Sequence, residues 1–225
     1  MIQVFGIPHH PNAARYVEQM ILRDTPDVVG VERHQEVLEH LVHVLERGPK
    51  TDEEKRTVKL EAGDGIVAAV ESARRTGSRL VGLEPERGYN VSRSDIRGDL
   101  WGKFWKGFEA WFEDAVGARL DRMGQLNPSA YQSSGAMAIK EHLARWAWRR
   151  YWYPGYVTAA LHREEAYAKT LVRLEQEERA RLGRDPKVYF FVGAGHKWNT
   201  EKLVRKERSK EESTRIGETS HQTLA

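Results

Sequence analysis

Short apolar runs alternate with amphipathic helical segments over the first 83 residues, and this alternation constrains the fold more than any other feature. Three runs predict strands, at residues 2–5, 28–31 and 79–83. Apolar residues recur on one helical face between them, at residues 12–23, 37–45 and 65–75. The strand run VVGV lacks the polar alternation of a half-exposed strand, as expected in a parallel sheet covered on both faces. We therefore expect an α/β fold with a central, mainly parallel sheet flanked by helices.

The middle of the chain interrupts this alternation. Residues 94–183 contain long helical patterns, and we expect them to form a helical lobe inserted between strands. The predicted helices of the lobe span residues 96–123, 136–152 and 157–182. The stretch 101–152 is rich in tryptophan, which suits either the core of the lobe or the wall of a groove for an apolar ligand.

The strand pattern returns near the end of the chain. Residues 187–192 (KVYFFV) predict a buried strand, and residues 201–208 predict a final helix. The sequence thus predicts one domain over residues 1–210 and a disordered polar tail over residues 211–225. The charged segment 51–56 is predicted to be a loop.

Composition excludes several classes of protein. Apolar residues make up 40% of the chain and charged residues 31%, which is enough to bury a core, and no apolar run approaches the ~20 residues that span a bilayer. The opening MIQVFGIPHH has no basic leader, so we expect a cytoplasmic protein without a membrane partner. The absence of cysteine excludes thiolate metal sites and a cysteine nucleophile. The net charge of +3 is modest, and acidic residues alternate with the basic residues of the last helix, so no nucleic-acid partner is expected.

Histidine or carboxylate side chains follow every predicted strand. His9 and His10 come after the first strand, Glu32 after the second, Glu84 after the third and His196 after the last. The carboxyl ends of parallel strands meet at one edge of a sheet, where ligands bind. Histidine acts as a base or a metal ligand near neutral pH, and glutamate can complete a metal site or orient an imidazole. Each residue alone suits a structural role, but together they predict a polar active site.

Two Gly-x-x-His turns, Gly6–His9 and Gly193–His196, belong to an ordered set of segments that resembles the TraB/TIKI superfamily, which is related to the erythromycin-esterase and ChaN-type proteins. The matching segments are residues 4–10, 26–32 (PDVVGVE), 68–87 and 188–196 (VYFFVGAGH). They cover about a third of the chain and bracket most of it. The resemblance implies an α/β fold and a hydrolase-like site. It also implies that TIKI-like relatives are metal-dependent proteases, that esterase-like relatives use a histidine base, and that ChaN-like relatives bind haem iron.

The resemblance also implies roles for individual residues. His9 and His196 match the two histidines of the Gly-x-x-His motifs, and Glu32 matches the acid after the second strand. Glu84 lies near the acid after the third strand, although GLEPER departs from the family's Gly-Asp-Arg. Arg163, within HREEAYA, matches an arginine on a helix that faces the site. His10 beside His9 leaves the register of the first motif open.

The leading hypothesis is metal-dependent hydrolysis of an amide (peptide) or ester bond. His9, Glu32 and His196 would hold a divalent ion, which lowers the pKa of a bound water. Imidazole and carboxylate ligands suit Mn, Co, Fe or Zn. Glu84 or Glu32 would take the proton from the water, and Arg163 or Arg87 would stabilise the oxyanion or hold a substrate carboxylate.

Three alternatives stay open. The first is a metal-free site in which His9 or His196 is the general base. The second is a non-catalytic protein that sequesters a peptide or a haem-like ligand against the aromatic lobe. The third, nucleotide binding at Gly193-x-Gly195, is disfavoured because the third glycine is missing and the motif follows the last strand. Apart from a peptide or small-molecule substrate, the expected partner is a second copy of the chain, since the aromatic lobe could hold a dimer interface.

Overall fold

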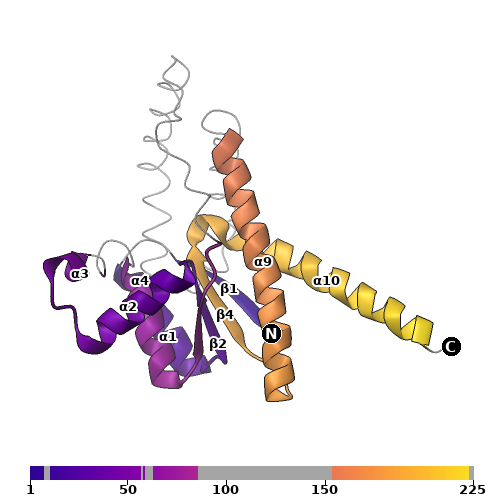
Figure 1. Cartoon of the computed structure of the whole chain (residues 1–225), viewed down its shortest axis with the longest axis horizontal. Helices are drawn as coiled ribbons and strands as arrows, with labels where there is room; N and C mark the ends of the chain where they lie inside the picture. Colours follow the sequence, from indigo (N-terminus) through magenta and orange to yellow (C-terminus); the bar gives the residue numbers. More distant parts are fainter. Residues whose placement is uncertain (8–10, 57, 59–62, 86–153, 223–225) are drawn as a thin grey trace, which may run out of the picture.

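A computed structural model describes residues 1–7, 11–56, 58, 63–85 and 154–222, and it has the expected α/β architecture (Figure 1). A four-stranded, all-parallel sheet lies between two layers of helices. The elements in chain order are β1 (Ile2–Ile7), α1 (Pro11–Asp24), β2 (Val28–Val31), α2 (Gln35–Arg47), α3 (Asp52–Arg56), α4 (Gly63–Thr76), β3 (Arg79–Gly82), α9 (Pro154–Leu182), β4 (Val188–Gly193), the 3₁₀ turn η5 (Ala194–His196) and α10 (Lys197–Gln222).

The two ends of the chain contribute neighbouring strands. The strand order is β1-β4-β2-β3, so the last strand inserts between the first and the second. Ile7 of β1 pairs with Gly193 of β4, and Val31 of β2 pairs with Phe191 of β4. This pairing confirms the expectation of a parallel sheet, and it brings the carboxyl ends of all four strands to one edge.

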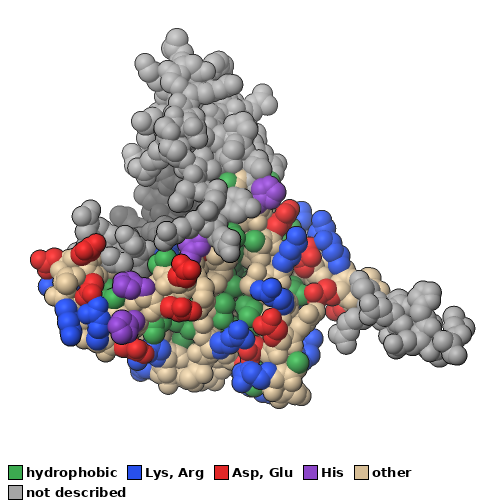
Figure 2. Space-filling view, in the orientation of Figure 1, with side chains coloured by type: hydrophobic (Ala, Val, Ile, Leu, Met, Phe, Trp, Pro, Cys, Tyr) green, Lys and Arg blue, Asp and Glu red, His purple; other side chains and the backbone are tan. Residues whose placement is uncertain are grey.

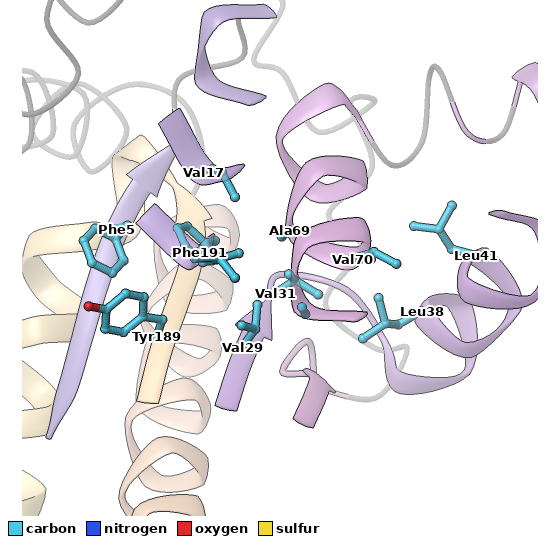
Figure 3. Close-up of a cluster of buried hydrophobic side chains, with 12 residues drawn as sticks. Phe5, Val17, Val29, Val31, Leu38, Leu41, Ala69, Val70, Tyr189 and Phe191 are labelled. Atoms are coloured by element: carbon cyan, nitrogen blue, oxygen red, sulfur yellow. The ribbon is translucent and has the colours of Figure 1, made fainter. Parts of the chain in front are cut away.

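The two faces of the sheet are covered by different helices. Alternate residues of β4 point to opposite faces, as the pleat requires. Tyr189 and Phe191 lie in a cluster with residues of α1, α2 and α4, where the Phe5 and Phe191 rings stack 5.2 Å apart (Figure 3). Phe190 and Val192 lie in a second cluster with residues of α9 and α10. Each fully buried side chain of this size contributes about 1.5–3 kcal/mol, so the uninterrupted apolar run of β4 anchors both layers.

A short helix occupies the segment that the sequence predicts to be a loop. Residues 52–56 form α3, and its first turn is capped from both directions. The Glu54 backbone N–H donates to Thr51 Oγ1 at 3.1 Å, while the Glu54 carboxylate accepts from the Lys50 and Thr51 backbone N–H groups. This reciprocal arrangement is a capping box, whose Thr-x-x-Glu signature is present at Thr51–Glu54. The expectation of a loop was wrong, because it rested on the high charge of the segment and left out the capping-box signature.

The last helix is longer than the sequence pattern indicates. The expected helix covers residues 201–208 and the expected disordered tail covers residues 211–225, whereas α10 runs from Lys197 to Gln222. Beyond the sheet it extends away from the rest of the described structure (Figure 1). Oppositely charged side chains one turn apart, such as Glu207 and Lys210 at 2.6 Å, support this exposed part. Residues 223–225 lie outside the described residues.

Most of the expected helical lobe, residues 94–153, lies outside the described residues, and the third helix expected there is α9. One face of α9 packs on the sheet, and the other carries side chains of both charges (Figure 2). Within the described ranges, no helix is long and apolar enough to cross a membrane.

Substitution of Gly82 by alanine is expected to lower the free energy of unfolding by about 1–3 kcal/mol. An added Cβ would lie 2.6 Å from the Arg33 carbonyl oxygen and 2.8 Å from the Gln35 backbone nitrogen, and backbone cannot move aside as a flexible side chain can. The matched control is Gly195→Ala, since nothing lies within 4 Å of its added Cβ. Urea denaturation of the two variants checks this, and equal stabilities would contradict the expectation.

Candidate active site

Side chains from three strand ends meet beneath α9. Glu32 directly follows β2, Glu84 lies two residues beyond β3, and His196 ends the 3₁₀ turn that follows β4. Backbone hydrogen bonds continue past the strands, since the Glu84 N–H donates to the Arg33 carbonyl at 3.0 Å. The helix α9 crosses above these ends and contributes Arg163. The structure thus brings four of the five predicted catalytic residues, Glu32, Glu84, Arg163 and His196, into one cluster.

The Glu32 carboxylate is held at both oxygens. Its Oε1 accepts from Arg163 Nη2 at 2.6 Å, and its Oε2 accepts from the Gly193 backbone N–H at 2.6 Å. A Cβ on residue 193 would lie 3.2 Å from that same Oε2. Glycine at the first position of the second Gly-x-x-His turn therefore lets the backbone approach the carboxylate closely.

Arg163 bridges the two strand-end carboxylates. Its Nη2 donates to Glu84 Oε2 at 2.7 Å as well as to Glu32, and its Nε lies 2.7 Å from Glu84 Oε1 at an angle outside the hydrogen-bonding range. Burial alone would lower the pKa of Arg163, but its interactions with Tyr167, Glu84 and Glu32 outweigh burial and raise that pKa above its ordinary value. Arg163 is therefore a permanent cation placed between two carboxylates.

Tyr167 follows Arg163 by one helical turn and completes this cluster. Its hydroxyl donates to Glu84 Oε2 at 2.6 Å and lies 3.4 Å from Glu32 Oε1. Burial, followed by the nearby carboxylates, raises the pKa of Tyr167 well above its ordinary value. The side chain therefore stays a neutral phenol that donates a hydrogen bond at neutral pH.

His196 is oriented by a buried carboxylate. Its Nδ1 lies 2.7 Å from Glu164 Oε1, and Glu164 has no exposed surface. The other oxygen of Glu164 accepts from Asn199 Nδ2 at 2.6 Å. A carboxylate at Nδ1 favours the tautomer with the proton on that nitrogen, which leaves the lone pair on Nε2. This Nε2 faces Glu32 Oε1 at 3.9 Å, too far for a direct hydrogen bond.

The site residues predicted from the sequence do not include the hydrogen-bonding partners that α9 and α10 supply. Glu164, Tyr167 and Asn199 are absent from the predicted site, although Glu164 and Tyr167 follow Arg163 by one and four positions. A spacing of four residues places Arg163 and Tyr167 on the same face of a helix, and this signal could have found the tyrosine. Glu164 and Glu165 are adjacent residues of the same type, so the sequence could not show which of them lies in the site. In the structure Glu164 is buried and Glu165 is exposed.

Three residues of the predicted site, His9, its alternative His10, and Arg87, lie outside the described residues. The described sheet ends β1 at Ile7, two positions before His9 and beside Gly193. The Nη2 and Nε atoms of Arg163 face Glu32 and Glu84. The expectation that Arg163 binds an oxyanion or a substrate carboxylate stays a prediction.

The described donors do not make a metal centre. Of the predicted ligands His9, Glu32 and His196, only the last two are described, and Glu32 already accepts hydrogen bonds from Arg163 and from the Gly193 N–H. A guanidinium within 2.6 Å of Glu32 Oε1 disfavours a second cation at that atom. In the described ranges, no group of three or more histidine or acidic side chains could hold an ion. The metal site that includes His9 stays a prediction.

No family model, curated protein or solved structure matches this chain. The resemblance to the TraB/TIKI superfamily therefore stays a prediction.

Proposed function

We propose that this protein is a hydrolase that cleaves an ester or amide bond, with His196 as the general base. The observation that carries the proposal is the pairing of the His196 Nδ1 with the fully buried Glu164 at 2.7 Å. A carboxylate–imidazole pair of this kind holds the ring in one orientation and directs the basic Nε2 toward the reacting atoms. The side chain of His196 is 12% exposed, which leaves it accessible to a small reactant.

The proposed reaction uses an activated water. Water between His196 Nε2 and Glu32 Oε1 can lie about 2.8 Å from both atoms, given their separation of 3.9 Å. Nε2 takes one proton as the water oxygen bonds to the carbonyl carbon of the substrate. The resulting imidazolium gives that proton to the leaving alcohol or amine when the carbon–heteroatom bond breaks.

The charges of the cluster support this assignment. Among the described residues, two carboxylates, Glu32 and Glu84, lie against the permanent cation Arg163, and a third, Glu164, lies against His196. The excess of negative charge stabilises the imidazolium that forms on His196 during the reaction. The same excess disfavours anionic substrates, so we expect neutral or cationic esters and amides to react fastest.

A panel of p-nitrophenyl esters and peptide p-nitroanilides tests the proposal. We expect turnover of neutral and cationic members by protein dialysed against EDTA, and rates about tenfold lower for anionic members, which corresponds to roughly 1.4 kcal/mol of repulsion. The hydrolysis products should be identified by mass spectrometry. Absence of hydrolysis across the panel, with or without metal, would contradict the proposal.

The same panel distinguishes the metal-dependent alternative. Loss of turnover in EDTA, its return with Mn²⁺, Co²⁺, Fe²⁺ or Zn²⁺, and its loss in His9→Ala would favour an ion held with the help of His9. Turnover that is unchanged by chelator and by added metal would favour His196 acting without an ion.

A further inference from the structure

The outer edge of β1 lies opposite the pairing with β4. In the described sheet β1 is an edge strand whose strand neighbour is β4. The Val188 N–H donates to the Met1 carbonyl, and in a parallel ladder the backbone groups of alternate residues face the partner. The N–H and C=O groups of Ile2 and Val4 therefore face away from β4. Such an edge is a template for an additional strand.

A groove of about 270 Å³ runs along this edge. One wall is formed by residues 2–5 of β1, and the other by a stripe along α10. The α10 residues follow the i, i+4, i+7, i+8, i+11 pattern of one helical face: Lys197, Glu201, Val204, Arg205 and Arg208. Ligand pockets for whole small molecules begin at about 300 Å³, so this groove suits side chains of a strand whose backbone lies along β1.

The charge of the groove is predominantly positive. Lys197 Nζ lies 3.2 Å from Glu201, and Arg208 pairs with the buried Glu175. Arg205 is 78% exposed and lies 3.9 Å from a Glu201 oxygen that also borders the groove. Three cations therefore face two carboxylates, and the most accessible of them is Arg205.

We propose that the groove binds an extended acidic peptide segment, which pairs with the outer edge of β1 at Ile2 and Val4 and adds a fifth strand to the described sheet. Main-chain hydrogen bonds to Ile2 and Val4 would supply affinity, and the α10 stripe would select the side chains. An apolar side chain would contact Val204, and a carboxylate beside it would pair with Arg205. A second copy of this chain suits the edge less well, because it would bring two α10 stripes of the same charge together.

The test uses the full chain and a capped fluorescent hexapeptide in which valine alternates with glutamate. We expect saturable binding by fluorescence anisotropy, weakened at least tenfold when salt rises from 50 to 500 mM. Arg205→Glu should weaken binding of this peptide at least tenfold and should strengthen binding of the matched valine–lysine peptide. Arg173→Glu, which changes an exposed arginine on α9, should leave both affinities unchanged.

Strand pairing is tested on the peptide, so that the protein stays intact. Two peptides are N-methylated at alternate peptide bonds, in the two complementary patterns, so that each lacks the N–H donors of one edge. We expect one of the two to bind the protein at least tenfold more weakly than the parent peptide. Equal affinity of both N-methylated peptides and the parent would overturn the proposal, as would equal binding of acidic and basic peptides. Light scattering gives the remaining arm: a concentration-dependent dimer that the acidic peptide does not dissociate would assign the edge to a second copy.

Discussion

Replacement of His196 by alanine is expected to lower kcat for ester or amide hydrolysis by about 10²–10⁴-fold, the usual contribution of a general base. The substitution removes Nε2, the atom that takes the proton from water in the proposed reaction. Initial rates on the best substrate of the panel give the measurement. His40→Ala provides the matched control, because His40 is an exposed histidine on α2 and its loss should leave kcat unchanged.

Folding must be separated from catalysis in this experiment. Alanine at residue 196 leaves the buried Glu164 without its imidazole partner, and a buried carboxylate that loses a partner destabilises the fold. His196→Gln retains a side-chain amide that can donate to Glu164 but has no basic nitrogen. We expect His196→Gln to be as inactive as His196→Ala and to unfold at a urea concentration closer to that of the wild type. Activity in a folded His196→Gln protein would exclude the ring as the base.

Glu164 should act through His196 and not on the substrate. Glu164→Gln keeps the shape and a hydrogen-bonding group at Nδ1 but removes the charge that stabilises the imidazolium. We expect a loss of kcat that is smaller than in His196→Ala, because the ring and its Nε2 remain in place. A loss of kcat as large as in His196→Ala, in a variant that is folded, would contradict this assignment.

Regular patterns in the sequence determined what could be predicted. The β-branched run of β2 and the apolar run of β4 indicate parallel strands, and side chains at their carboxyl ends identify Glu32 and His196 before any geometry is available. The role of Arg163 could not be predicted, because it depends on how α9 is rotated above the sheet. Glu164 and Glu165 carry the same carboxylate, so the sequence does not distinguish them. The rotation of α9 about its axis buries Glu164 and exposes Glu165.

Substitution of Arg163 by methionine is expected to lower the free energy of unfolding by about 3 kcal/mol, the lower end of the range for breaking a buried ion pair. Methionine has a similar length and keeps apolar packing, but it leaves Glu32 and Glu84 without their shared cation. The lower end of the range applies because Arg163 is 23% exposed and both carboxylates are 14% exposed, so solvent screens part of the charge. Urea denaturation at pH 7 gives the measurement.

Two matched variants isolate the charge. Arg173→Met removes an arginine from the same helix that is 69% exposed and pairs with Glu177 at 3.6 Å, and it should cost less than about 0.5 kcal/mol. Glu84→Gln in the Arg163→Met background removes one of the two repelling carboxylates and should recover a large part of the loss. Equal destabilisation by Arg163→Met and Arg173→Met would show that the bridge contributes nothing beyond a surface ion pair.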